Sequence, residues 1–142
     1  MGAGAAVFAS GELGHRIKGY VLASPYRDLK IAVLNRIENA VPPLLDRIAY
    51  LGLLAVSPLI FPDLESISPV VAISGIPIDV PVLILAGGED PVARPDEAQA
   101  IFERVRSHAK LILFEHAGHM NFLEMYPDLY QRSVLGLLHK IN

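Results

Sequence analysis

The second half of the chain alternates between short apolar runs and longer segments of helical periodicity. Residues 82–86 and 109–114 are apolar nearly throughout, as expected of strands that are covered on both faces of a sheet. Residues 95–107 carry an apolar face at helical spacing behind a proline in the first turn, and residues 126–141 predict a closing helix. The order strand, helix, strand, helix predicts a parallel sheet with helices packed against it.

The chain opens with a helical pattern that leads into a further strand. Residues 1–13 combine strong helix formers with glycines, and Gly14 is placed to end the helix. Residues 19–24 are a short apolar run that Pro25 closes, which predicts a buried strand. The whole chain therefore supplies about three parallel strands and belongs to the α/β class of folds.

A helical stretch interrupted by prolines separates this strand from the later ones. Residues 28–40 have apolar side chains at helical spacing and end before two prolines. Residues 44–56 predict a second, very apolar helix. From Pro58 onward, further prolines predict irregular backbone with a short helical turn at residues 70–74.

Composition narrows the functional classes. The chain has 142 residues, 52% hydrophobic and 19% charged, which is typical of one globular domain over residues 1–142. A net charge of −3 without a basic tract does not favour a nucleic-acid partner, and the absence of cysteine excludes disulfides, thiolate zinc sites and a cysteine nucleophile. The longest charge-free run, residues 48–62, is too short for a transmembrane helix, and the opening lacks the basic region of a signal peptide. We therefore expect a cytoplasmic protein without a transmembrane segment.

Two polar clusters directly follow the two later strands. The first is GGED, which ends at Asp90, and the second is EHAGHMN, which contains His119. Because the carboxyl ends of parallel strands meet at one edge of a sheet, Asp90 and His119 are expected to lie close together. A carboxylate there can orient an imidazole and stabilise it when protonated. Gly118 is expected to give the backbone the freedom to turn His119 inward.

Each cluster also has a purely structural interpretation. GGED after a strand can be a polar turn in which the aspartate caps the next helix, and a glycine–histidine pair after a strand is an ordinary loop. We expect His116 to have no role and Glu89 to be solvated. The remaining histidines, His15, His108 and His139, are expected at the surface. The conjunction of strand, Asp, helix, strand, His and helix favours the functional interpretation.

This conjunction resembles the C-terminal half of the α/β-hydrolase family. PVLILAGGEDPVARPDEA resembles the strand and loop that carry the catalytic acid, and KLILFEHAGHMNFLE resembles the final strand and histidine loop. The resemblance implies that Asp90 is the acid and His119 the base of a catalytic triad. It covers essentially the whole chain, a partial α/β-hydrolase fold in which residues 26–78 correspond to the variable cap inserted into the domain.

The opening MGAGAA resembles the helix that follows the family's nucleophilic serine, with Gly2 as the last glycine of G-x-S-x-G. The chain itself contains no G-x-S-x-G, because Ser10, Ser24 and Ser74 all lack the flanking pattern. The resemblance therefore implies that the nucleophile precedes Met1 in a longer natural protein. The backbone N–H of Met1 would then be one oxyanion donor, and the chain alone would be inactive.

The resemblance implies a serine hydrolase of the monoacylglycerol-lipase-like or serine-aminopeptidase-like kind, which needs no metal or organic cofactor. Its expected partner is a small-molecule ester or amide with a hydrophobic acyl group. A set of apolar residues in the cap region favours such a substrate. The alternative is that these residues serve only to pack the cap onto the body. These are Leu44, Leu45, Ile48, Leu51, Leu53, Leu54, Ile60 and Phe61.

Other functional classes stay open at this stage. The chain could be a non-catalytic α/β-hydrolase-like protein that binds a partner or self-associates through an open sheet edge. It could also be a family member with a different chemistry, because the fold hosts several. A dinucleotide-binding motif at residues 2–7 is not favoured, because Val7 stands where the third small residue belongs and no strand precedes it.

Overall fold

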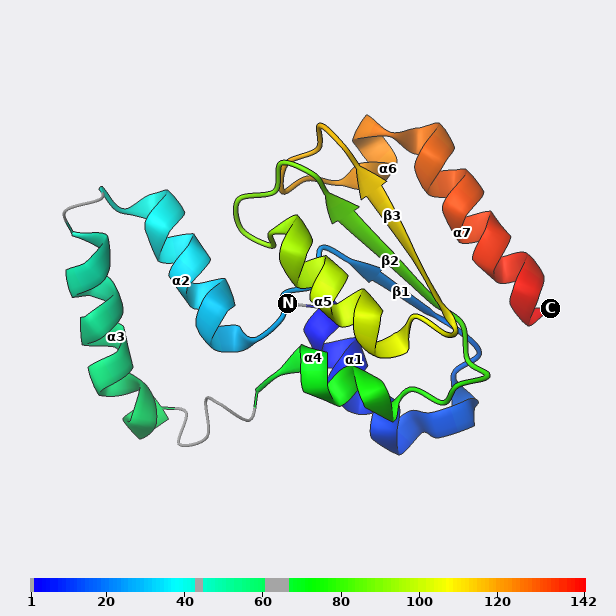
Figure 1. Cartoon of the computed structure of the whole chain (residues 1–142), viewed down its shortest axis with the longest axis horizontal. Helices are drawn as coiled ribbons and strands as arrows, with labels where there is room; N and C mark the ends of the chain where they lie inside the picture. Colours follow the sequence, from blue (N-terminus) through cyan, green and yellow to red (C-terminus); the bar gives the residue numbers. More distant parts are fainter. Residues whose placement is uncertain (1, 43–44, 61–66) are drawn as a thin grey trace.

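A computed structural model of the chain describes residues 2–42, 45–60 and 67–142. In these residues the strands form a three-stranded parallel sheet with the order β1-β2-β3 (Figure 1). The strands are β1 (Tyr20–Ala23), β2 (Val82–Gly87) and β3 (Ala109–Phe114). The α/β class and the parallel sheet predicted from the sequence are confirmed, and β3 has the predicted bounds.

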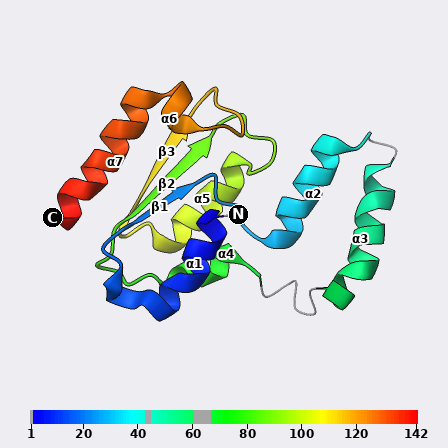
Figure 2. The same ribbon diagram turned by 180° about the vertical axis from the view of Figure 1, so that it is seen from behind.

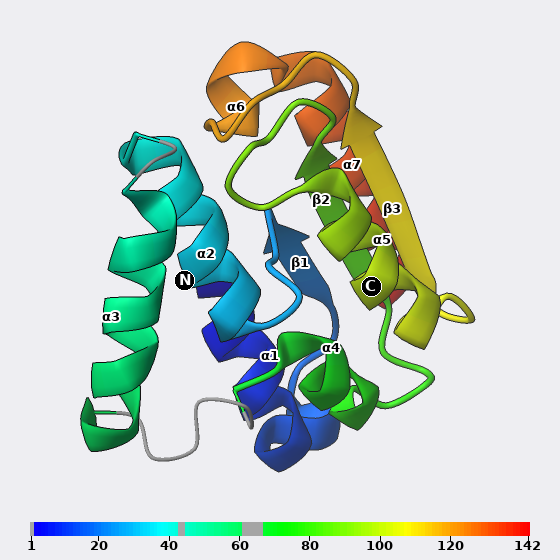
Figure 3. The ribbon, with the colours of Figure 1, turned by 60° about the vertical axis from the view of Figure 1, so that its left-hand side comes forward.

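Helices cover the two faces of the sheet unequally. On one face, α1 (Gly2–Leu13) and α5 (Pro95–Val105) enclose a core that contains Val7, Leu22 and Ile101. On the other face, α7 (Pro127–Ile141) packs Leu137 against a smaller core around Leu83 and Phe114. Figure 3 shows α5 in front of the strands and α7 behind them. The parallel crossovers thus place a helix layer on each side of β2, as the strand–helix alternation predicts.

Burial differs sharply between the three strands. All six residues of β2 are buried, as expected of a central strand covered on both faces. The expectation of two covered faces is wrong for β3, where Lys110 and Leu113 are exposed because the strand lies at one edge of the sheet. In β1, Val21 and Ala23 are exposed and their N–H groups point away from β2, since Tyr20 and Ser24 donate toward β2.

The outer edge of β1 therefore has no strand partner among the described residues. This agrees with the open sheet edge expected from the sequence. Self-association through that edge stays a prediction, because the structure holds a single chain.

The first helices follow their predicted positions. α1 ends at Leu13, and Gly14, with a φ of +51°, begins a 3-10 turn, η1 (Gly14–Arg16). α2 (Leu29–Ala40) begins after Asp28, whose carboxylate accepts a hydrogen bond of 2.9 Å from the backbone N–H of Ile31.

The next helix is longer than the sequence pattern indicates. α3 (Asp46–Ile60) continues through Pro58, so the expectation of irregular backbone from that proline is wrong. A proline in the last turn removes only one helical hydrogen bond, which the helix tolerates better than a proline in its middle. The predicted start at Leu44 lies outside the described residues. Figures 1 and 2 show α2 and α3 side by side, next to the sheet rather than on it.

Several short elements complete the fold. α4 (Pro69–Ala72) and η3 (Ile73–Gly75) occupy the position of the predicted helical turn. α6 (Phe122–Met125) is a short helix that the sequence pattern missed, and Asn121 caps it by accepting a 3.2 Å hydrogen bond from the N–H of Leu123. Across the described ranges, the model contains no helix with the length and hydrophobicity needed to cross a bilayer.

Candidate active site

Asp90 lies in the loop after β2 with its side chain fully buried. Carboxylate oxygen Oδ1 accepts hydrogen bonds from the backbone N–H groups of Val92 (2.8 Å) and Ala93 (2.9 Å). These bonds close a tight turn, as the structural interpretation of GGED expects, but Asp90 does not cap the next helix, because the N-cap of α5 is Arg94. The other carboxylate oxygen remains available for a second interaction.

That interaction is with His119, in the loop after β3. Asp90 Oδ2 lies 2.8 Å from Nδ1 of His119, whose side chain is 45% exposed. An ionised carboxylate can only accept a hydrogen bond, so Nδ1 of a neutral His119 must carry the proton and Nε2 must carry the free lone pair. Among the described residues, the side chain of His119 has this one hydrogen bond. The pair is therefore a half-exposed base oriented by a buried acid.

Two glycines allow the two loops to approach each other. Gly88 donates its N–H to the carbonyl of Phe114 (2.8 Å), and Glu89 donates to the carbonyl of Ala117 (3.0 Å). A Cβ atom at Gly87 would lie 2.8 Å from the carbonyl oxygen of Gly118, and one at Gly88 would overlap the backbone of residue 115. Only glycine therefore fits at positions 87 and 88.

The role expected for Gly118 is not seen. Among the described glycines only Gly14 has a positive φ, and a Cβ at Gly118 would meet nothing closer than 3.9 Å. The space that lets the two loops approach lies at Gly87 and Gly88, where the loop after β2 (residues 88–94, the acid loop) begins, and not beside His119. Backbone of the loop after β3 (residues 115–121, the histidine loop) passes directly over these two glycines.

An aromatic cluster packs at the two ends of the histidine loop. Phe114, the last residue of β3, stacks on Phe122 with ring centroids 4.4 Å apart, and Tyr126 lies 5.3 Å from Phe114. Phe114 and Phe122 are both buried. The cluster ties the beginning and end of the loop together and limits where His119 can lie.

The other histidines make no hydrogen bond with this pair in the described part of the chain. His116 contacts Glu89 at 3.1 Å, and both side chains are largely exposed, as expected for a solvated Glu89. His15 is also exposed, and its hydrogen bond to Asp79 lowers the pKa of that carboxyl group. His139 is exposed as expected.

His108 is partly buried. Its Nε2 atom is buried and has no partner among the described residues, while Ser107 Oγ lies 3.0 Å from Nδ1. Burial lowers the pKa of His108, because the charged imidazolium would lose its hydration. The expectation of a surface position is only partly met, because residue 108 lies in the turn where α5 leads into β3 and one side of its ring is covered.

No serine in the described part of the chain completes a triad. Ser10 is buried and donates its hydroxyl to the carbonyl of Val7 (2.6 Å), which removes it as a nucleophile. Where the structure describes the side chains, no serine hydroxyl hydrogen-bonds to His119. Ser24 has a φ of +44°, so the chain turns sharply at the carboxyl end of β1, a feature that the sequence pattern missed. Met1, the expected oxyanion donor, lies outside the described residues.

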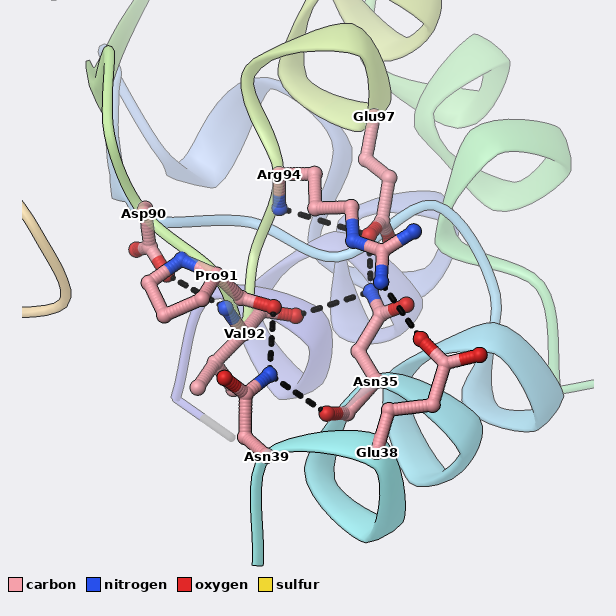
Figure 4. Close-up of polar contacts among 8 residues, drawn as sticks. All are labelled: Asn35, Glu38, Asn39, Asp90, Pro91, Val92, Arg94 and Glu97. Carbon is pink, nitrogen blue, oxygen red and sulfur yellow. Dashed lines mark hydrogen bonds and ion pairs between the residues drawn. The ribbon is translucent and has the colours of Figure 1, made fainter. Parts of the chain in front are cut away.

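Polar side chains of α2 hydrogen-bond to the acid loop, and this contact was not expected from the sequence. Asn35 and Glu97 are almost completely buried and hydrogen-bond to each other at 2.6 Å (Figure 4). A signal for this contact exists in the sequence, since Asn35 lies three residues after Ala32 on the helix face that is buried.

Within the described ranges, no group of three or more metal-ligating side chains could hold an ion.

Most of the apolar side chains that the structure describes in the region expected to form a cap are exposed. Leu45, Ile48, Leu51 and Leu53 are exposed in the described chain. Leu44 and Phe61 lie outside the described residues, as does the side chain of Ile60, and Leu54 is half-buried.

Comparison with known proteins shows which proteins this geometry resembles. The model of the family described as serine aminopeptidase, S33, matches residues 74–125, a segment that contains both Asp90 and His119. The three parallel strands with their flanking helices show an α/β-hydrolase fold, and the family match covers the segment that contains both polar loops.

Two relatives make the likeness more specific. A pimeloyl-[acyl-carrier protein] methyl ester esterase of Neisseria meningitidis is 36% identical over 64 residues, which cover 43% of this chain and 20% of that protein. The esterase Pf2001 of Pyrococcus furiosus has a similar fold, with a TM-score of 0.69 and 21% identity over 99% of this chain and 50% of that one. A second crystal form gives a TM-score of 0.66 at 19% identity, over 98% of this chain and 49% of the esterase. The chain thus spans about half of the solved esterase.

Proposed function

We propose that the chain is the C-terminal part of a serine hydrolase that cleaves carboxylic esters, with Asp90 and His119 as acid and base of its catalytic triad. The observation that carries this proposal is the 2.8 Å contact between buried Asp90 Oδ2 and half-exposed His119 Nδ1. Matches to esterases and to a serine aminopeptidase family support the reaction class. Nothing in the matches favours the non-catalytic alternative.

In this proposal each residue has a defined step. A serine outside this chain attacks the ester carbonyl, and Nε2 of His119 takes its hydroxyl proton as the new C–O bond forms. His119 then returns that proton to the leaving alcohol when the ester C–O bond breaks. Water repeats the sequence to release the acid and regenerate the serine. Asp90 keeps the imidazole in the productive tautomer and stabilises the imidazolium, and the backbone N–H of Met1 would help bind the oxyanion.

The substrate is proposed to be a small ester with a hydrophobic acyl group, and residues 26–78 are proposed to form a cap over the site. Support comes from the ester substrate in the name of the Neisseria relative and from the exposed apolar side chains of α3. An amide substrate is the alternative, because the matching family model is that of a serine aminopeptidase. A series of p-nitrophenyl esters of increasing acyl length, beside matched anilides, distinguishes these substrates.

The test of the proposal uses the full natural polypeptide that carries this chain. His119→Ala should lower kcat for the best ester by at least about a thousandfold, because removing the base leaves only the oxyanion hole and binding. His116→Ala is the matched control, since this second histidine of the same loop is exposed and should leave kcat unchanged. Full activity in the His119 variant, or no labelling of the polypeptide by a serine-directed phosphonate, would contradict the proposal.

A further inference from the structure

The two backbone N–H groups that bind Asp90 belong to two successive peptide groups, and α2 holds both of these peptides from the other side. The peptide between Pro91 and Val92 donates its N–H to Asp90 Oδ1 at 2.8 Å, and its carbonyl accepts from Asn39 Nδ2 at 2.9 Å. The peptide between Val92 and Ala93 donates its N–H to the same oxygen at 2.9 Å, and its carbonyl accepts from Asn35 Nδ2 at 3.0 Å (Figure 4).

From this pairing we infer that Asn35 and Asn39 are positioning residues for Asp90, and through it for His119. The inference rests on the proposed function for its catalytic meaning. In a trans peptide the C=O and N–H point in opposite directions, so a donor on one side and an acceptor on the other determine the orientation of the peptide plane. Two peptides held in this way leave the Asp90 carboxylate one orientation, with Oδ2 directed at His119 Nδ1.

The partners of the two amide groups determine which way each amide faces. Asn35 Nδ2 donates to the carbonyl of Val92 and to Glu97 Oε1, and Asn39 Nδ2 donates to the carbonyls of Asn35 and Pro91. All four partners accept hydrogen bonds, so turning either amide would place its oxygen against two acceptors. Both Nδ2 groups thus use two donors, and neither side chain can rotate without breaking two bonds.

Glu97 fixes the more buried of these asparagines in turn. Its Oε1 accepts from Asn35 Nδ2 at 2.6 Å and from the N–H of Arg94 at 3.3 Å, and its Oε2 accepts from the N–H of Arg27 at 2.9 Å. Asn35 is 1% exposed and Glu97 is 2% exposed, so these bonds do not compete with water. The beginning of α5, the segment before α2 and the acid loop are joined through one carboxylate.

The consequence is a continuous path of hydrogen bonds from α2 to the imidazole of His119. Each amide–carbonyl bond polarises its peptide and strengthens the N–H bond to Asp90 on the far side. Because α2 lies in the region proposed as the cap, a shift of α2 would change the orientation of the acid as well as the shape of the substrate site.

The test compares Asn35→Ala and Asn39→Ala with the control Glu38→Ala in the full natural polypeptide. Glu38 is on the same helix and joins the same loop through Arg94 at 2.6 Å, but it contacts neither of the two peptides. The readout is the Nδ1 proton of His119 in the NMR spectrum of histidine-labelled protein, assigned with His119→Ala. Its rate of exchange with solvent reports the Asp90–His119 bond directly, whether or not the protein hydrolyses esters.

We expect Asn39→Ala to raise this exchange rate roughly two- to tenfold, the factor that corresponds to one lost hydrogen bond, and Asn35→Ala to raise it further. Glu38→Ala should leave the rate unchanged. Asn39 is largely exposed, so its variant should remain folded even if Asn35→Ala does not. Where ester hydrolysis is present, kcat should fall in the asparagine variants with KM little changed.

Three outcomes would overturn the inference. The first is an unchanged exchange rate in Asn39→Ala, and the second is a rate in Glu38→Ala that rises as much as in Asn39→Ala, which would indicate general loosening of α2. The third is the absence of the Nδ1 resonance from the unsubstituted protein. Absence of esterase activity from the unsubstituted protein, with the exchange pattern as expected, would instead contradict the proposed function.

Discussion

The loop after β2 and the loop after β3 supply the two sides of one hydrogen bond, but they are built in opposite ways. The acid loop buries its carboxylate completely and binds it with two backbone N–H groups, which are themselves held by α2. The histidine loop leaves its imidazole 45% exposed and gives it one hydrogen bond among the described residues. Asp90 is thus held in place and shielded from water, whereas Nε2 of His119 has no hydrogen bond among the described residues.

This difference follows from what each group does in the proposed reaction. Asp90 keeps its charge throughout, so a rigid, dry environment strengthens its electrostatic effect on His119. His119 changes its protonation state and meets the substrate, so it must be reachable. Substitutions in the two loops should therefore have unequal effects, which can be measured separately on activity and on stability.

The largest expected effect comes from Asp90→Asn in the full natural polypeptide. The amide oxygen can still accept from Val92 and Ala93, but the amide nitrogen would then donate to Nδ1 of His119. This forces the proton onto Nε2, which can no longer accept one from the serine, and kcat should fall about ten-thousandfold. Steady-state ester hydrolysis measures the loss, and a thermal melt close to that of the unsubstituted protein serves as control. Appreciable residual turnover would show that the acid loop does not act through the tautomer of His119.

Substitutions at Gly88 and Gly118 test which of the two loops is more tightly packed. Gly88→Ala would push a methyl group into the backbone of residue 115 and should lower the free energy of unfolding by about 2 kcal/mol. Gly118→Ala should change it by less than about 0.5 kcal/mol, because its Cβ meets nothing closer than 3.9 Å. Urea denaturation of both variants gives the two values. Equal effects would mean that the histidine loop is as tightly constrained as the acid loop.

The buried carboxylate behind the acid loop gives a third comparison. Glu97→Gln replaces an acceptor that faces the N–H groups of Arg27 and Arg94 and the amide of Asn35. One of these donors would face an NH2 group, which should lower the free energy of unfolding by about 1–3 kcal/mol. The control is Glu103→Gln on the exposed face of α5, expected within about 0.5 kcal/mol. A Glu97 variant as stable as this control would mean that the network does not hold the acid loop.

The smallest expected effect is a pH dependence that comes from the partly buried His108. Burial lowers the pKa of His108 below its ordinary value of 6.5, so the unfolded chain takes up a proton that the folded chain refuses. Its contribution should therefore reduce the free energy of unfolding as the pH falls through 6.5 toward 5. His108→Gln should remove that part of the pH dependence, whereas His116→Gln in the exposed Glu89 pair should not. Denaturation at pH 7.5 and pH 5.5 measures both, and an identical pH dependence in all three proteins would contradict the assignment.

Several features could be predicted from the sequence because they depend on local chemistry. The apolar runs became parallel strands, and Asp90 and His119 met because the carboxyl ends of neighbouring parallel strands share an edge. Gly14 ended α1, as its position after the helical pattern indicated. In each case the pattern of a short segment determines the local structure, and the rules of parallel α/β folds determine how the segments are arranged.

Other features escaped the sequence pattern because they depend on which surfaces come into contact. Gly87 and Gly88 are required only because backbone of the histidine loop passes over them, whereas Gly118 looked equally special in the sequence. The exposure of β3 reflects its place at the edge of the sheet, although its composition resembles that of β2.

The amino-acid sequence by itself thus determined the kinds of elements, their parallel arrangement and the contact between Asp90 and His119. Only the tertiary structure decided how the acid is held, through Asn35, which reaches the carbonyl of Val92 from 57 residues earlier in the chain. The physical reason is the distance along the chain over which each interaction acts. Hydrophobic periodicity and turn chemistry act over a few residues, whereas a buried amide finds its acceptors only after helices and sheet have packed together.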